Sequence, residues 1–389
     1  MVRAPYAASS KRPKKLPLPY ASRRPHATVL YQLVKDHFAE FHRYATESYD
    51  KPLPRYVEKE IRGYLQCGDF AHGFVQLVCQ RCANEVLVPF SCKSRSICPS
   101  CAGRRMAAQA AHLVDAVVPA VPVRQYVLSL PFDLSLLAAT NPVVLRAITR
   151  VHYEELTKHY RACARNQGTI DKTYPGAVTF VQRFGSSLNL HLHLHVCVLD
   201  GVYIEQQDDA PTFLPAPPLR KDQLHKLTEK VALRVAKWLR KRGYSKDEHD
   251  YSSNEPRQLS FAEMLAHQAA QRGSIEQVQD DDDDAKADAA HPAACPPLRD
   301  EAATFFGFNP HASTRIAADD DVGRERLFRY GLRPPFSLGR FRMLRDGRVC
   351  YRIKKSNRRA SRCRIMTLIE CLARLCALIP PPGHDQNPG

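Results

Sequence analysis

The spacing of apolar residues divides the chain into helices and strands. Between residues 28 and 66 apolar side chains recur at helical spacing, which predicts a pair of helices. Residues 104–121, 134–165 and 219–242 show similar helical patterns, and 123–130 (VRQYVLSL) is predicted as a strand that ends before a proline. The apolar positions of the first helices are Tyr31, Leu33, Val34, Phe38, Phe41, Val57, Ile61 and Tyr64.

Residues 190–199 (LHLHLHVCVL) alternate strictly and predict a strand. Successive side chains of a strand point to opposite faces, so the face of leucine and valine meets the core. The other face carries His191, His193, His195, Cys197 and Leu199. The Cα atoms of His193 and His195 are expected about 6.6–7 Å apart, so both imidazoles can converge on one metal ion. The alternative to a metal site is that the histidines simply line a polar face of the sheet.

A partner strand is predicted immediately before the histidines, at 177–184 (AVTFVQRF), with the turn at 185–189. A turn centred on residues 187 and 188 places Gln182 opposite His193 and Phe180 opposite His195. Opposed residues share a face, which makes the amide oxygen of Gln182 a candidate third metal ligand. A slip of one residue would move Gln182 to the other face.

A helix that carries Tyr330 is predicted after the acidic residues 319–321, which can cap it, and Pro334 ends it. Three arginines surround this tyrosine, and their guanidinium groups can bind phosphates and stabilise a phenolate. They are Arg326, Arg329 and Arg333. A tyrosine that only packs on an amphipathic helix is the alternative.

Six of the thirteen cysteines lie between residues 67 and 101. Two C-x2-C knuckles separated by 15 residues match the spacing of tetrahedral zinc sites, and a closed site of four thiolates is structural. The expected ligands are Cys79, Cys82, Cys98 and Cys101, with Cys67 and Cys92 as alternates or as ligands of a second ion. Four basic residues lie near the knuckles and suggest that the zinc site supports a DNA-binding surface: Lys93, Arg95, Arg104 and Arg105. The alternative is a metal ion that only holds the helices together.

Charge narrows the class of partner. The formal net charge is +17, with 57 Lys and Arg against 40 Asp and Glu, which favours nucleic acid. No apolar run approaches the ~18 residues of a membrane-spanning helix, so no membrane partner is expected. The sequence contains no G-x4-G-K-[ST] loop, so no nucleotide cofactor is expected either.

Several segments together resemble one family, the HUH-type rolling-circle insertion-sequence transposases of the IS-ninety-one-like group. They follow the order of that family across residues 30–382. The matching segments are Cys67-Gly-Asp, Ser91 to Cys101, Tyr126 to Pro131, Val181 to Asn189, His193-Leu-His195, Asp200-Gly-Val, Arg329 to Pro335, Asp346-Gly-Arg-Val and Leu378 to Pro382.

The resemblance implies an α+β chain, with a small zinc-binding domain before an HUH nuclease domain whose central antiparallel sheet has helices on one side. It also implies that His193 and His195 hold a catalytic Mg or Mn ion and that Tyr330 cleaves and rejoins single-stranded DNA through a 5′-phosphotyrosine. We expect a DNA-associated protein of the bacterial cytoplasm. The expected division is a basic disordered arm (1–27), a helical zinc-binding domain (28–115), the first nuclease part (116–205), a helix with a flexible acidic insert (206–303), and the tyrosine part with a C-terminal helix (304–389).

Two departures qualify this expectation. Some relatives carry a second tyrosine four residues before the first, where this chain has Arg326, so it resembles the single-tyrosine kind. The chain ends at Gly389, before a Tyr-His-Gly segment that usually follows the proline run, which indicates a shortened or decayed copy. The alternative functions are a zinc-dependent DNA-binding protein without catalysis and a plasmid replication initiator, for which Tyr351 in Tyr-Arg-Ile-Lys would be the competing nucleophile.

Overall fold

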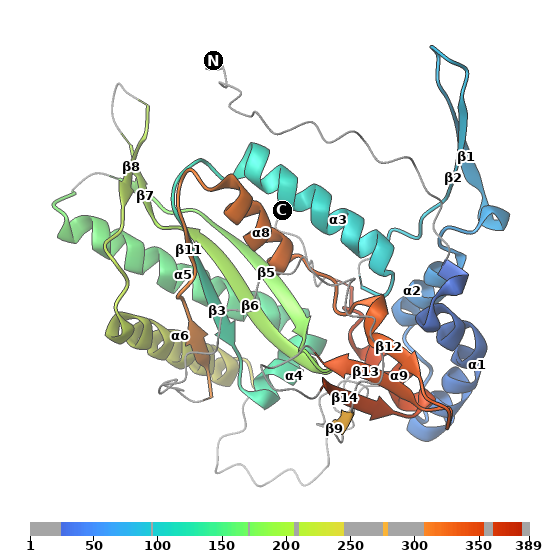
Figure 1. Ribbon diagram of the computed structural model, residues 1–389. Helices are drawn as coiled ribbons and strands as arrows, with labels where there is room; N and C mark the ends of the chain where they lie inside the picture. Colours follow the sequence, from blue (N-terminus) through green and yellow to red (C-terminus); the bar gives the residue numbers. More distant parts are fainter. Residues whose placement is uncertain are drawn as a thin grey trace, which may run out of the picture.

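The computed structural model describes residues 25–94, 96–169, 172–205, 210–244, 275–278, 307–353 and 361–382 (Figure 1). Arg95, the first 24 residues of the predicted arm and the acidic run at 280–284 lie outside these ranges. Within them the fold is mixed, with helices packed around antiparallel sheets, as predicted. None of the helices in these ranges is long and apolar enough to cross a membrane.

The predicted pair of helices opens the described chain, after a short 3-10 turn at Pro25–Ala27. α1 spans Val29–Tyr49 and α2 spans Arg55–Gln66. The hydroxyl of Thr28 caps α1 by accepting a bond from the backbone N–H of Tyr31 at 3.2 Å. The apolar positions of both helices are buried in one core, which confirms the periodicity.

Next comes a hairpin and then a long helix. A 3-10 turn (Phe70–His72) leads into β1 (Phe74–Val78) and β2 (Glu85–Pro89), which pair only with each other among the described strands. α3 (Pro99–His112) begins directly after Cys98 with a proline in its first turn and continues into a π-helical segment, Leu113–Val117.

The central sheet is antiparallel, in the order β10-β3-β6-β5, and β11 also pairs with β3. Its two longest strands are the predicted histidine hairpin. The strands are β3 (Val123–Ser129), β5 (Ala177–Phe184), β6 (Leu190–Leu199), β10 (Asn309–His311) and β11 (Arg315–Ile316).

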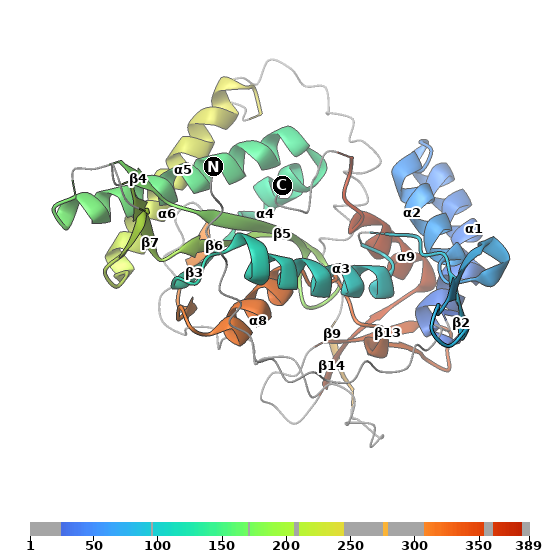
Figure 2. The same ribbon diagram turned by 90° about the horizontal axis from the view of Figure 1, so that it is seen from above.

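Helices cover both faces of this sheet (Figure 2). The leucine and valine face of β6 packs into the main core with α4 (Phe132–Thr140) and α5 (Pro142–Asn166), and α6 (Lys221–Lys241) contacts α5. The histidine face is covered by α3 and α8 (Asp321–Gly331). The expectation of helices on one side is therefore wrong, because the histidine face also carries apolar side chains, Phe180 and Cys197 among them, that α8 buries.

The C-terminal segment returns to the N-terminal helices. A second antiparallel sheet, in the order β12-β13-β14-β9, is followed by α9 (Leu368–Ala377), which packs on α1 (Figure 1). A third, small sheet has the order β4-β7-β8. The strands of these two sheets are β9 (Ile275–Val278), β12 (Phe341–Met343), β13 (Val349–Ile353), β14 (Ser361–Met366), β4 (Thr173–Tyr174), β7 (Gly201–Ile204) and β8 (Thr212–Pro215).

Candidate active site and metal centre

The register of the histidine hairpin places the candidate ligands as predicted. Gln182 on β5 lies opposite His193 on β6, and Phe180 lies opposite His195. On the other side of β6, His195 pairs with Val127 of β3, and Val127 in turn pairs with His311 of β10. Because opposed residues share a face, the histidines of β6 and His311 lie on the sheet face that α8 covers.

The three histidines of β6 form a row of neighbouring rings. The centroids of His191 and His193 are 5.2 Å apart, and those of His193 and His195 are 4.9 Å apart. Nδ1 of His193 lies 3.0 Å from the carbonyl oxygen of His191, to which it can donate. That bond fixes the tautomer whose Nε2 lone pair is free, an arrangement typical of metal-binding histidines.

His195 has a buried nitrogen with no protein partner. Its side chain is 3% exposed, and its Nε2 lacks any hydrogen bond. Burial lowers the pKa of His193 to about 4 and the pKa of His195 well below its usual value. Both imidazoles are therefore neutral near pH 7, which is the form that binds a metal ion. An orphaned buried nitrogen beside a second imidazole fits a cation ligand set.

Gln125 is a site residue that the sequence did not reveal. It lies on β3, and its amide nitrogen is 2.9 Å from Nδ1 of His195. A half-turn of this amide presents its oxygen to an Nδ1–H and leaves the Nε2 lone pair of His195 available. The alternation of β3 could have placed Gln125 on the same face as Val127, but it could not show that the amide reaches His195.

Gln182 fastens the end of α8 to the sheet. Its amide nitrogen donates to the backbone oxygens of Tyr330 at 2.7 Å and Gly331 at 3.1 Å. Its amide oxygen accepts from Arg333 at 3.3 Å. In this structure the amide predicted as a third metal ligand thus holds the tyrosine helix in place.

Tyr330 lies beside the histidine row. Asp320 caps α8, as expected, by accepting from the backbone N–H of Gly323 at 2.7 Å. The Tyr330 ring meets the His195 ring edge-on, with centroids 5.4 Å apart. The guanidinium carbon of Arg333 lies 4.5 Å from the centroid of the Tyr330 ring, so a cation stands over the candidate nucleophile.

A cavity of about 740 Å³ opens next to Tyr330. Four arginines line it: Arg326, Arg329, Arg333 and Arg340. Tyr330 lines the cavity and also contacts His195, so this side chain connects the cavity with the histidine row. Arg326 and Arg329 are both exposed, and Arg329 forms an ion pair with Glu325 at 2.7 Å.

Tyr351 lines the same cavity but is far more enclosed. It lies on β13, the strand predicted after the turn at Asp346, and is 1% exposed. Its ring packs 4.9 Å from that of Phe341, and burial raises the pKa of its hydroxyl. Packing therefore accounts for Tyr351.

Four cysteines lie close together between the end of α2 and the start of α3. The sulfur atoms of Cys67, Cys92, Cys98 and Cys101 all lie within 4.8 Å of one another. Cys67 follows α2, while Cys98 and Cys101 flank the first residues of α3. Four thiols in this arrangement fit a structural zinc ion.

This set differs from the expected pairing of two knuckles. Cys79 and Cys82 lie in the turn between β1 and β2, where both are exposed. The five paired residues of the hairpin carry that turn about 16 Å from its base at the usual rise per residue. The second knuckle is instead joined by the two alternates, Cys67 and Cys92.

Side-chain hydrogen bonds hold the loop between Cys92 and Cys98 in place. A carboxylate oxygen of Glu60 accepts from the hydroxyls of Ser94 at 2.6 Å and Ser96 at 3.1 Å. Arg105 donates to the backbone oxygen of Lys93 at 2.7 Å, so this predicted DNA ligand also supports the loop. Arg104, on the same helix, is exposed.

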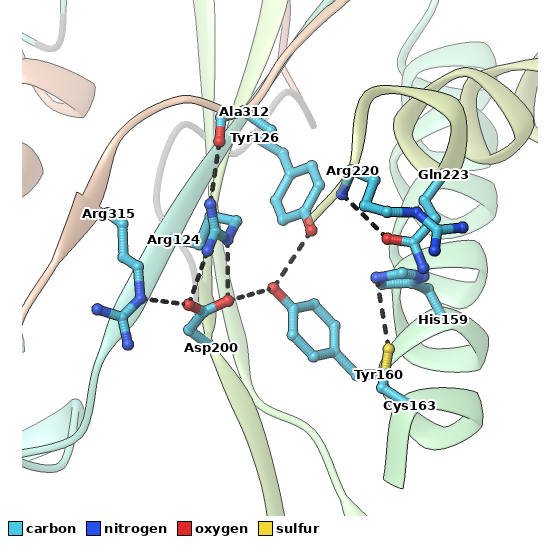
Figure 3. A network of polar contacts seen from close by, with 10 residues as sticks. All are labelled: Arg124, Tyr126, His159, Tyr160, Cys163, Asp200, Arg220, Gln223, Ala312 and Arg315. Atoms are coloured by element: carbon cyan, nitrogen blue, oxygen red, sulfur yellow. Dashed lines mark hydrogen bonds and ion pairs between the residues drawn. The ribbon is translucent and has the colours of Figure 1, made fainter. Parts of the chain in front are cut away.

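A second polar network, which the sequence did not reveal, anchors the strand of His311 (Figure 3). Asp200 is 2% exposed and accepts from Arg124 at 2.9 and 3.0 Å, from Arg315 at 2.7 Å and from the Tyr160 hydroxyl at 3.1 Å. Arg124 also donates to the backbone oxygen of Ala312 at 3.4 Å. The network ties β11 and the residue after His311 to β3.

Comparison with known families agrees with this arrangement. Residues 33–130 match the family model described as "Transposase zinc-binding domain", of the IS91 type, and residues 176–387 match the one described as "Putative transposase". No match was found among curated proteins or among solved structures. The second family model covers more than half of the chain and follows the zinc-binding one. The chain therefore belongs to the IS91-like transposases, with an N-terminal zinc-binding domain followed by the transposase domain.

Proposed function

We propose that this transposase cleaves and rejoins single-stranded DNA with Tyr330 as its nucleophile. The observation that carries the proposal is the position of Tyr330, which contacts His195 on one side and lines an arginine-rich cavity on the other. A nucleophile held on a helix against a sheet is positioned more rigidly than one on a loop. A zinc-dependent DNA-binding protein without catalysis would not require this contact.

The proposed reaction is a transesterification. The Tyr330 hydroxyl loses its proton and attacks the scissile phosphorus, while the bond from phosphorus to the 3′ oxygen breaks. The products are a 5′-phosphotyrosine and a free 3′-hydroxyl. A 3′-hydroxyl can later attack the phosphotyrosine, which restores a phosphodiester and the tyrosine. The number of phosphoester bonds is conserved, so no nucleotide cofactor is needed.

His193 and His195 would hold a divalent ion, Mg or Mn, with His311 or a reoriented Gln182 as a third ligand. The free Nε2 of His195 and the His193 tautomer support these two histidines as ligands. The bound ion would polarise a phosphate oxygen as a Lewis acid. Gln125 would orient the His195 ring from behind.

The arginines of the cavity would bind the DNA backbone and neutralise charge that develops on the phosphate. Phosphoryl transfer depends mainly on positioning and charge stabilisation. Arg333, whose guanidinium lies over the Tyr330 ring, is placed to stabilise a phenolate. Arg326 and Arg329 of α8 would contact phosphates on either side, and Arg104 on α3 would extend the basic surface.

The zinc-binding domain would form one wall of this cavity. Pro99 and Ser100, in the first turn of α3, line it. Cys98 and Cys101 flank these residues, so an ion in the Cys67 cluster would set the position of this turn. In this proposal the zinc ion is structural, and it supports the DNA site rather than the chemistry.

The experiment is a search for a covalent complex. The full chain is incubated with Mn and labelled single-stranded oligonucleotides copied from the ends of the mobile element that encodes it. We expect a labelled protein band that survives denaturation and is absent with the matching duplex. DNA binding without such a band, across the full set of end sequences, would favour the non-catalytic alternative.

A further inference from the structure

The turn between β1 and β2 has the geometry of a metal knuckle. It is closed by a bond of 2.9 Å from the Cys79 backbone N–H to the Asn84 oxygen and another of 2.9 Å from the Ala83 N–H to the Cys79 oxygen. The backbone N–H groups of Arg81 and Cys82 and the Cys82 thiol lie near the Cys79 sulfur. Both sulfurs therefore lie on one side of the turn.

This knuckle supplies only half of a zinc site. Zinc in a structural site takes four ligands in a tetrahedron. Among the residues that the structure describes, the Cys67 cluster is the one group of three or more potential metal ligands, and it does not include Cys79 or Cys82. That cluster already has the four thiols of a complete tetrahedral site, so none of them is available to the knuckle. None of the described residues of the same chain is placed to supply the other two ligands, whereas a second copy of the chain offers an identical pair.

The hairpin that carries the knuckle is suited to a protein partner. It stands away from the other elements (Figure 1), and apolar side chains are exposed along both strands. Arg81 and Glu85 are the only charged residues between 74 and 90, so this segment has no net charge in a chain of +17. A DNA-binding arm would be basic. The exposed apolar side chains are Phe74, Val75, Leu77, Val78, Val86, Leu87 and Phe90.

We propose that two copies of this chain join at their hairpin tips by sharing one zinc ion. Cys79 and Cys82 of each copy would supply the four thiolates, each thiol losing its proton on binding. A two-fold axis through the ion makes the two halves identical, as in most homodimers. The apolar strands of the two hairpins would then lie close enough to shield one another from water.

This pairing would also give a single-tyrosine transposase two nucleophiles. Each chain contributes one Tyr330, so a dimer could hold two covalent DNA ends at once. That consequence rests on the proposed function, whereas the shared zinc ion does not.

The test combines zinc content with molecular mass. The full chain is purified in a phosphine reductant, which prevents disulfides, and is analysed by elemental analysis and light scattering. The proposal predicts a dimer with 1.5 zinc ions per chain, because each Cys67 cluster holds one ion and the hairpins share another. The double variant Cys79→Ser, Cys82→Ser should be a folded monomer with one ion per chain.

A matched control places two serines in the same turn and keeps both cysteines. Gln80→Ser with Asn84→Ser should remain a dimer with 1.5 ions per chain. Three results would overturn the proposal: a wild-type monomer, two ions per chain, or a dimer that persists in the double cysteine variant. None of these measurements depends on Tyr330, so their failure is distinct from a failure of the covalent-complex assay.

Discussion

The ring of Tyr330 on α8 stands edge-on to the imidazole of His195 on β6, with 5.4 Å between the centroids and 82° between the planes. These residues come from elements far apart in the sequence, and their contact depends on how α8 lies on the sheet. Gln182 holds the end of that helix through the Tyr330 and Gly331 backbone oxygens. The proposed chemistry is therefore sensitive to changes in packing that touch neither the tyrosine nor a histidine.

Gly331 tests this sensitivity directly. A Cβ at this position would lie 2.6 Å from a ring carbon of Phe180, so Gly331→Ala must displace α8 or the Phe180 ring that it packs against. Overpacking of this kind costs about 1–3 kcal/mol of stability, and a shift of about 1 Å at a reacting group can cost on the order of 100-fold in rate. We expect cleavage of single-stranded DNA to fall by roughly that factor.

The control for this substitution is Gly103→Ala on α3, where an added Cβ meets nothing within 4 Å. Alanine is favoured over glycine in a helix by about 1 kcal/mol, so this variant should unfold at an equal or higher temperature and cleave normally. Equal rates for both glycine variants would show that the position of α8 does not limit the reaction.

Gln125→Leu should weaken the proposed metal site of His193 and His195 without removing a ligand. The variant loses the amide beside Nδ1 of His195, and the loss of such a supporting bond typically lowers metal affinity by about 10–100-fold. Cleavage rates measured against Mn concentration should show a higher requirement for Mn and a near-normal rate at saturation. Gln32→Leu, at an exposed position of α1, should leave the Mn requirement unchanged. A normal Mn requirement in Gln125→Leu would remove Gln125 from the site.

Substitution of single cysteines should distinguish the structural zinc ligands from the hairpin pair. Cys67→Ser takes a ligand from the buried cluster, so we expect the loss of one zinc ion per chain and a clear fall in the unfolding temperature. Cleavage should fall too, because the first turn of α3 lines the Tyr330 cavity. Cys79→Ser should leave the unfolding temperature close to that of the wild type. If Cys79→Ser instead lost a zinc ion and stability while Cys67→Ser did not, the two-knuckle site expected from spacing would be the correct one.

The Asp200 network should contribute strongly to stability. Asp200→Asn removes the only carboxylate that Arg124 contacts among the described residues, and breaking a buried ion pair costs about 3–5 kcal/mol. The exposed pair of Asp222 with Arg220 offers the control, since water screens this pair and Asp222→Asn should change the stability far less. Urea unfolding of both variants measures the difference. If Asp200→Asn and Asp222→Asn unfold at similar urea concentrations, the Asp200 network does not contribute to stability.

Local patterns were sufficient for the parts of the site that lie on one hairpin or one helix. Strict alternation and a short turn gave the register of Gln182 with His193, and the acidic cap with its proline stop located the helix of Tyr330. Both features are determined by residues close in sequence, where strand alternation and capping act.

Features that join distant segments were not predictable in this way. Gln125 contacts His195 because of the β3–β6 register, which is set across a connection of about sixty residues containing two helices. Asp200 gathers partners from residues 124, 160 and 315. The four clustered cysteines differ from the set expected from spacing because the β1–β2 hairpin is long enough to carry its own knuckle away from the cluster.

The most direct test compares the covalent DNA complex of two tyrosine variants. Tyr330→Phe removes the hydroxyl of the half-buried tyrosine whose ring lies beside His195. Tyr351→Phe removes the hydroxyl of the buried tyrosine that lines the same cavity. Each change keeps its ring, so both proteins should fold and bind single-stranded DNA. Our account predicts no covalent complex with Tyr330→Phe and a normal yield with Tyr351→Phe. A complex that persists in Tyr330→Phe and disappears in Tyr351→Phe would contradict it and assign the nucleophile to Tyr351.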